Sequence, residues 1–94
     1  MDTIETTFSL GRVVATPGAL AALEEARESS LGYLMRHAAR DWAEIPPEDW
    51  AENEFSIKNE LRVLSAYTLR NGTKIWIITE ADRSVTTLLL PEEY

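Results

Sequence analysis

Five side chains in this sequence have the chemical types needed to cleave a phosphodiester without a metal ion. They are His37, Arg62, Tyr67, Glu80 and Arg83. A carboxylate such as Glu80 can take a proton as general base, and His37 or Tyr67 can return one as general acid. Arg62 and Arg83 can stabilise the charge that develops on the phosphate. One interpretation is therefore a small metal-independent endoribonuclease, which requires the acid and the base to approach the same phosphate from opposite sides.

A second set of residues, in the last third of the chain, is suited to binding. Tyr67 and Trp76 are expected to be neighbours across a hairpin, where their rings can stack a nucleic-acid base or another flat ligand. Alternatively, the two rings shield the strands or lie between two copies of the chain, as in a self-associating structural module such as a homodimer. The expected binding surface comprises Ser65, Tyr67, Trp76, Glu80, Arg83 and Thr87.

Acidic residues are concentrated in one segment of the chain. The sequence has 16 acidic and 9 basic residues, a net charge of −7, and most of the excess falls in residues 41–60. A helix there would carry an acidic face formed by Glu48, Asp49, Glu52 and Glu60. Rows of carboxylates can imitate a phosphate backbone and occupy a basic groove on a nucleic-acid enzyme; the simpler interpretation is a solvated helix face. The negative balance also limits any contact with nucleic acid to a local basic or aromatic patch.

The residue inventory excludes several kinds of site. Without cysteine and with one histidine, the chain has no thiol chemistry, and we expect neither a metal nor a cofactor. It contains no glycine-rich loop that could cradle a phosphate and no Gly-x-Ser-x-Gly motif. No apolar run approaches the length of a membrane-spanning helix, and the first residues lack the pattern of a secretory signal. We therefore expect a cytoplasmic protein without membrane contact, and an enzyme is the less favoured interpretation.

The elements that must position these residues follow from caps and periodicity. Residues 7–15 alternate as a strand, with Gly11 at a place where a bulge could form. Thr16-Pro17 predicts the start of a helix over 17–28, Ser29-Ser30 caps a second helix, and Pro46-Pro47 starts a third over 47–60. The apolar stripes of these helices are expected to comprise Leu20, Leu23, Leu31, Leu34, Met35, Ala38, Trp50, Ile57 and Leu61. His37 falls at the flank of its stripe, as an ordinary surface or boundary residue would.

From residue 61 onward the period changes to that of strands, and Asn71-Gly72 predicts a two-residue type I′ hairpin. In that register Tyr67 lies opposite Trp76, and a second turn over 81–84 sets Thr79 against Thr86. The face toward the helices would then hold Leu64, Ala66, Ile75, Ile77, Leu88 and Leu90. The open face would hold Val63, Ser65, Tyr67, Trp76, Ile78, Glu80, Thr87 and Leu89.

These elements predict a single α+β domain over residues 1–94. Two or three N-terminal helices would pack on one face of a small antiparallel β-meander, formed by three C-terminal strands and an N-terminal strand. This layout is similar in architecture to small ribonucleases of the barnase and RelE type, which act on an exposed sheet face. An architectural likeness of this kind does not establish function by itself.

Several motifs together resemble a family of small bacterial proteins described as "plasmid-related protein" or as a type I restriction subunit. The motifs are the Leu-Gly-Arg-Val-Val-Ala-Thr-Pro-Gly-Ala-Leu opening at 10–20, Arg36-His37 before Asp41-Trp42, Ser65-Ala66-Tyr67, and the Ile-Thr-Glu-Ala-Asp-Arg-Ser-Val-Thr-Thr and Leu-Leu-Pro-Glu-Glu-Tyr ending. Where that family reads Gly-Asp-Trp-Gly, this chain has Arg40 and Ala43 in place of the glycines. If those glycines let the backbone approach a ligand, the site has been altered here.

The resemblance implies a mobile-DNA context, such as a plasmid, a phage, an island or an integron gene cassette. The leading expectation is an accessory protein that binds or inhibits a macromolecular partner, either a host defence protein or a nucleic-acid-processing protein. The open sheet face and the acidic helix are the two candidate surfaces.

Overall fold

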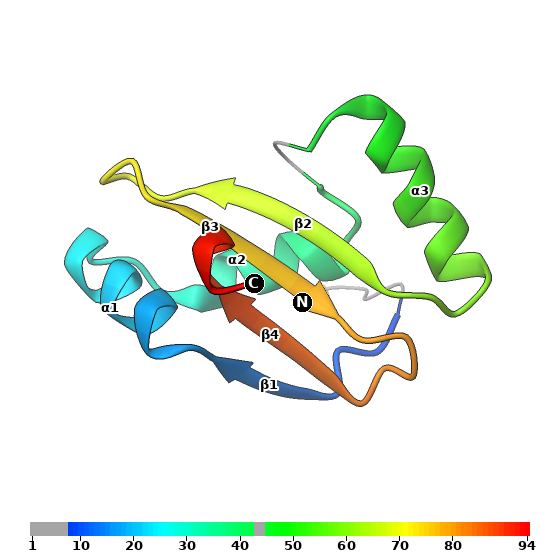
Figure 1. The fold of residues 1–94 in the computed structure, drawn as a ribbon, viewed down its shortest axis with the longest axis horizontal. Helices are drawn as coiled ribbons and strands as arrows, with labels where there is room; N and C mark the ends of the chain where they lie inside the picture. The colour runs from blue at the N-terminus through cyan, green and yellow to red at the C-terminus, as the bar shows by residue number, and fades with distance from the viewer. Residues whose placement is uncertain (1–7, 43–44) are drawn as a thin grey trace, which may run out of the picture.

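The computed structural model describes residues 8–42 and 45–94. Three helices precede most of the sheet in the chain, which makes the protein an α+β fold (Figure 1). The elements are β1 (Arg12–Ala15), α1 (Pro17–Ala26), α2 (Ser30–Ala38), α3 (Pro47–Lys58), β2 (Val63–Thr68), β3 (Lys74–Thr79), β4 (Val85–Leu89) and the 3-10 turn η1 (Pro91–Glu93).

Side-chain caps confirm the predicted starts of α1 and α2. The hydroxyl of Thr16 accepts a hydrogen bond from the Ala19 amide at 3.1 Å, and that of Ser29 accepts one from the Leu31 amide at 3.1 Å. These bonds satisfy amides that have no partner inside the helix. α1 ends earlier than predicted because Arg27 adopts a left-handed φ of 56° and returns its amide to the last turn. A positive φ after the final helical residue is a common way for a helix to stop.

The four strands form a mixed sheet in the order β1-β4-β3-β2. β2, β3 and β4 are antiparallel neighbours, as predicted, but β1 pairs in parallel with β4. Three helices separate β1 from the hairpins, so no tight turn imposes an antiparallel pairing. Gly11 does not form a bulge within the strand. Its φ of 63° lets the backbone pass close to the carbonyls of Arg83 and Ser84, where a side chain would collide.

The predicted register of the first hairpin is wrong by one residue. The amide of Leu69 donates to the carbonyl of Thr73 at 2.8 Å, so the loop contains three residues, Arg70 to Gly72. Gly72, with φ 90°, takes the left-handed position that ends such a loop. Tyr67 therefore pairs with Ile75 rather than with Trp76. The register of the second hairpin, with Thr79 opposite Thr86, is confirmed.

This one-residue shift turns β2 over while leaving β3 and β4 as predicted. Val63, Ser65 and Tyr67 point to the helices, and Leu64 and Ala66 point to the other face, because residues opposite one another in a pair share a face. Figure 1 shows α2 passing behind the strands and η1 lying in front of them. The core between helices and sheet comprises Ala19, Ala22, Leu23, Ala26, Leu34, Tyr67, Leu69, Ile75, Ile77 and Leu88.

Parts of the predicted apolar stripes do not pack. Leu20 and Leu31 are 57% and 61% exposed, because α1 and α2 present Leu23, Leu34 and several alanines to the sheet instead. In α3, Trp50 is 40% exposed, and Leu61, beyond the end of that helix, is 45% exposed. Of the predicted stripe, Ile57 alone packs against a small cluster of Phe8, Trp42 and Val63.

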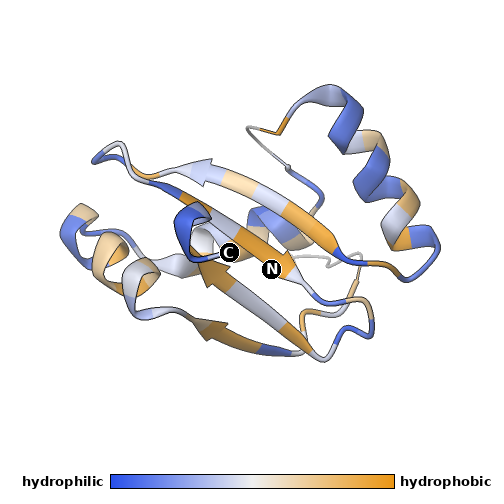
Figure 2. Ribbon diagram, viewed as in Figure 1, coloured by the Kyte–Doolittle hydropathy of each residue, from blue (hydrophilic) through white to orange (hydrophobic). Residues whose placement is uncertain are grey.

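α3 lies beside the outer edge of β2 and is largely hydrophilic (Figures 1 and 2). Among the described residues 47–58, Asn53 alone is buried. Its amide group donates to the carbonyl of Leu64 at 2.6 Å and accepts from the Leu64 amide at 3.1 Å. The side chain thus takes the place of a neighbouring strand and satisfies main-chain groups that an edge strand leaves unpaired.

Replacing Asn53 with alanine is expected to lower the free energy of unfolding by about 1 kcal/mol, because both hydrogen bonds to Leu64 are lost and water only partly replaces them. Urea denaturation of the purified variant would measure the change. Asn59→Ala is the matched control, since Asn59 lies at the exposed end of the same helix and bonds only within it. Equal effects of the two substitutions would show that the Asn53 contact does not hold the strand edge.

Candidate functional site

The residues proposed for catalysis do not meet at one surface. His37 and Tyr67 lie on the helix-covered side of the sheet, and each is at most 1% exposed. Glu80 follows β3 and pairs with Arg62 across 3.6 Å. By strand alternation Glu80 belongs with Trp76 on the opposite face. The candidate base is therefore separated by the sheet from both candidate acids.

His37 is the centre of a buried polar cluster, not a boundary residue as expected. Its Nε2 lies 2.9 Å from Thr79 Oγ1, and its Nδ1 contacts Ser65 Oγ. The Thr79 hydroxyl lies 2.7 Å from that of Thr86, which donates to the carbonyl of Leu10 at 2.7 Å. The rings of Phe8 and Trp42 meet the imidazole edge-on, with centroids 5.4 and 5.8 Å away. Phe8 and Trp42 therefore bury the flank of α2 that carries His37. The periodicity of the helix did not predict this contact.

The hydrogen bonds of the cluster determine which nitrogen of the imidazole carries the proton. Thr86 gives its one proton to the Leu10 carbonyl, so Thr79 must donate to Thr86 and accept from His37 Nε2. Nδ1 then has no proton and accepts from Ser65. Burial lowers the pKa of His37 to about 3, so the ring is neutral near pH 7. A neutral, fully enclosed imidazole stabilises the core and does not serve as a proton donor to an external substrate.

Tyr67 likewise has a structural role. Its hydroxyl donates to the carbonyl of Asp41 at 2.6 Å, which ties the chain after α2 to the sheet. The Arg36 guanidinium lies 4.8 Å from the centre of the ring and forms an ion pair with Asp41. Burial raises the pKa of Tyr67 to about 12. Ser65 is buried beside it, so two members of the expected binding surface face the helices.

The two arginines proposed as phosphate contacts are occupied by other parts of the chain. Arg83 donates to the main-chain carbonyls of Leu61, Glu80, Ala81 and Ser56, and its guanidinium lies 5.6 Å from the Phe8 ring. These contacts connect the β3–β4 turn to the end of α3. Arg62 pairs with Glu80 and donates to the hydroxyl of Tyr94, whose ring it also covers. The sequence patterns contain no signal for either role.

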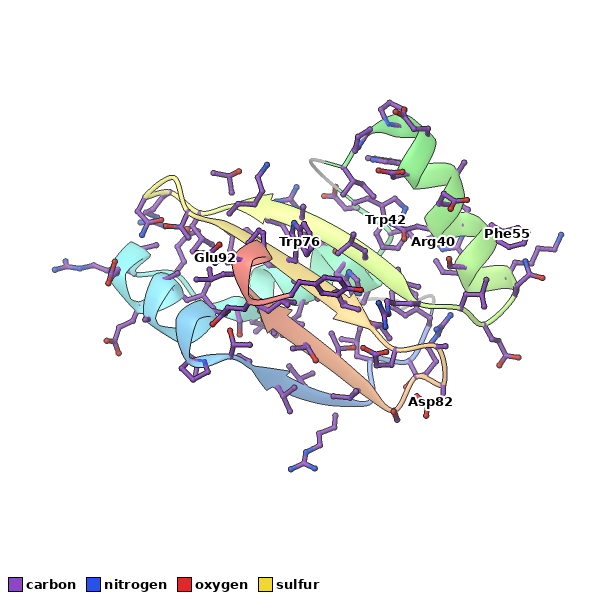
Figure 3. The ribbon with its side chains drawn as sticks, viewed as in Figure 1. Arg40, Trp42, Phe55, Trp76, Asp82 and Glu92 are labelled. Carbon is purple, nitrogen blue, oxygen red and sulfur yellow. The ribbon has the colours of Figure 1, made fainter. Side chains whose placement is uncertain are left out.

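The remaining predicted residues lie on the open face, which is partly covered by the end of the chain. Trp76 meets the ring of Tyr94 edge-on, with centroids 5.7 Å apart, and both Trp76 and Thr87 are half-buried. Figure 3 shows Trp76 beside η1. Glu93 accepts hydrogen bonds from the Thr16 hydroxyl at 2.5 Å and from the Leu90 amide at 2.8 Å, which holds η1 over the sheet. The expected stacking platform of Tyr67 and Trp76 is therefore absent.

The acidic face of α3 is exposed as predicted. Glu48, Asp49 and Glu52 are exposed along the helix, and Glu60 is exposed just after it. Glu54, which belongs to the acidic segment but not to the predicted face, pairs with Arg40 across 2.7 Å. Phe55, which sequence reasoning omitted, is 57% exposed and points away from the sheet (Figure 3). An aromatic side chain among charged neighbours was the sequence signal that could have identified Phe55 as a candidate binding residue.

A pocket of about 260 Å³ lies between α3 and the β2 edge. Asp49 and Glu52 line it from the helix, Leu64 lines it from β2, and Arg62 lines it from the residue before that strand. Ile45, Asn53 and Ser56 complete the wall. The pocket therefore combines apolar surface with two carboxylates and the guanidinium of Arg62, which is paired with Glu80.

The backbone conformation of Arg40 offers an explanation for the glycine that the family resemblance suggests at this position. Its φ of 67° lies in the left-handed region, just after the C-cap of α2 at Ala39. A glycine would relieve backbone strain there without any ligand nearby. Ala43, the other replaced position, lies outside the described residues.

Within residues 8–42 and 45–94, no group of three acidic or histidine side chains is arranged to hold a metal ion. No described helix combines the length and the apolar character needed to cross a membrane. In comparisons with protein-family models, with curated proteins and with solved structures, nothing matched this chain, so the geometry above is the basis for assigning a function.

Proposed function

We propose that the protein is a binding protein that docks a basic surface of another protein onto α3 and the adjacent pocket. The observation that carries the proposal is the exposed surface of α3. Among its described residues the helix buries Asn53 alone, and it exposes carboxylates together with two aromatic rings, Trp50 and Phe55. Solvated acidic helices have little need for exposed aromatic side chains. Aromatic residues are, however, enriched among those that dominate binding energy at protein interfaces.

The charges on α3 define the chemistry of the partner. Residues 47–58 contain four acidic side chains and Lys58. Among these four acids, Glu54 alone forms an ion pair within the described residues. A partner rich in arginine and lysine would be attracted to this surface, and complementary charge chiefly raises the association rate and selects the partner. The aliphatic stem of such a side chain fits the apolar wall of the pocket, with its charged end near Asp49 and Glu52.

The resemblance to proteins of mobile DNA extends this proposal to a class of partner. Proteins that process or defend against foreign nucleic acid carry basic grooves for the phosphate backbone. A row of carboxylates on a helix can occupy such a groove in place of the nucleic acid. The proposed activity is therefore inhibition or recruitment of a nucleic-acid-binding protein, without chemistry by this chain.

The test compares three immobilised baits in bacterial lysate at moderate salt. They are the wild type, Glu48→Lys with Glu52→Lys on α3, and Glu24→Lys with Glu25→Lys on α1. Glu24 and Glu25 are exposed, so the two double variants change the net charge equally at different places. We expect proteins retained by the wild type and the α1 variant to be reduced about tenfold or more on the α3 variant.

Elution with duplex DNA at constant ionic strength then tests the class of partner. If the carboxylates occupy a nucleic-acid groove, DNA will displace the retained proteins, whereas a neutral polymer will not. Phe55→Ser should weaken retention without a change of charge, as expected for an aromatic anchor. Equal loss on both double variants would attribute binding to net charge alone and would refute the proposed role of α3.

A further inference from the structure

The two edges of the sheet differ in whether their main-chain groups are covered. Asn53 covers the outer edge of β2, as described above. No described residue pairs with the outer edge of β1, which lies at the margin of the sheet in Figure 1. Val13 and Val14 of this strand are 45% and 37% exposed. An uncovered edge with apolar side chains on both faces is a site at which another strand can add.

The hydrogen bonds of β1 show which main-chain groups face outward. The amide of Arg12 donates to the carbonyl of Ser84, just before β4, and that of Thr16 donates to the carbonyl of Leu88 in β4, each at 3.0 Å. Because successive residues of a strand direct their amides to opposite sides, those of Val13 and Ala15 point away from β4. These two residues form the free pairing edge.

We propose that β1 pairs antiparallel with β1 of a second copy of the chain, which would join two sheets into one. Placing Val14 on the two-fold axis opposite its own copy sets Val13 opposite Ala15. Each Val13–Ala15 pair could then exchange both of its main-chain hydrogen bonds, because these are the outward-facing residues. The same register brings Val14 against Val14, so the exposed apolar side chains cover one another.

Charge complementarity supports a second copy as the occupant. In this register Arg12 lies opposite Thr16 of the other copy, on the open face of the sheet. Thr16 holds the carboxylate of Glu93, which has no ion-pair partner among the described residues. Arg12 is exposed and is also outside those ion pairs. The two-fold axis would therefore place an arginine near an unneutralised carboxylate on both sides of the paired valines, an arrangement that an unrelated strand would not reproduce.

Self-association through β1 is independent of the proposed docking role of α3, since the two surfaces lie at opposite edges of the sheet. Pairing of such short strands buries little area, and contacts below about 1,000 Å² are typical of weak complexes. Sedimentation equilibrium from about 10 μM to 1 mM should therefore show a reversible monomer–dimer equilibrium. Amide chemical shifts over the same dilution series should change mainly at residues 12–16.

Three variants test the proposed register. Val14→Lys places two like charges opposite one another and should raise the dissociation constant at least about tenfold. Arg12→Glu should raise it as well, because it would face Glu93 of the other copy. Leu31→Lys is the matched control, since Leu31 is an exposed apolar residue on α2, and it should leave the equilibrium unchanged.

For this comparison, each variant must retain the thermal unfolding midpoint of the wild type. If Val14→Lys is unstable, Arg12→Glu alone tests the register. A wild-type chain that remains monomeric at 1 mM would overturn the proposal. Dimerisation of Val14→Lys or Arg12→Glu with wild-type affinity would also overturn it, because association would then use another surface.

Discussion

Replacing His37 with alanine is expected to lower the free energy of unfolding by about 3 to 5 kcal/mol. The substitution removes a fully buried ring from between Phe8 and Trp42 and leaves a cavity. It also removes the partner of Ser65 and the donor to Thr79, whose hydroxyls remain enclosed. Buried polar groups without partners and unfilled space are both costly, so the two effects add.

Urea denaturation followed by far-ultraviolet circular dichroism would measure this loss. Leu31→Ala is the control on the same helix, because Leu31 is exposed and its truncation should change stability by no more than about 0.5 kcal/mol. A loss below about 1 kcal/mol for His37→Ala would contradict the enclosed position of the imidazole.

Acidification from pH 7 to pH 5 is expected to cost the wild-type protein about 2 kcal/mol of stability through His37. The ordinary pKa of this group is 6.5, and burial lowers it to about 3 in the folded chain. Between these values the unfolded chain binds a proton that the folded chain does not, so protonation favours unfolding. The stability supplied by the neutral ring is therefore complete above pH 6.5 and is lost as the pH falls toward 3.

The three carboxylates whose pKa values are lowered in the folded chain do not produce this slope. Hydrogen bonds lower the pKa values of Glu28, Asp82 and Glu93 from ordinary values of 4.5, 3.8 and 4.5, so their contributions are lost mainly below pH 4.5. Urea midpoints at pH 7, 6 and 5 would measure the effect. In His37→Gln the decline should largely disappear whatever the absolute stability of that variant, and a wild-type midpoint that stays constant would contradict the assignment.

Local chemistry predicted the helices and the second hairpin because the deciding signals are local. Thr16 and Ser29 cap the helices whose starts they indicate, and the turn at 81–84 fixes the register of β3 with β4. The local signal at the first hairpin, Asn71-Gly72, fits two registers. Asn-Gly fits a two-residue loop and also the last two positions of a three-residue loop. Apolar residues on both faces of β2 then give no preference between the two registers.

The candidate site depended on that register more than the fold did. The helices cover the same side of β3 and β4 in either alignment, so the fold class is unaffected. Tyr67 and Ser65, however, change faces and leave Trp76 without its expected neighbour. The burial of His37 required Phe8 and Trp42, which are distant in sequence from Ser65 and Thr79 and follow no period. The acidic face was predictable because charge on a helix needs no long-range contact to be exposed.

The way in which α3 is attached to the sheet determines how freely the residues on its surface can be substituted. Two of its contacts, those of the Asn53 amide and the Arg83 guanidinium, are made to main-chain atoms that every sequence possesses. Exposed residues of the helix, including Glu52 at the pocket, are thus free to be exchanged without repacking the interior. A library randomised at Glu48, Glu52 and Phe55 should consequently keep its fold while acquiring new specificities, which makes this helix a ready scaffold for selecting binders.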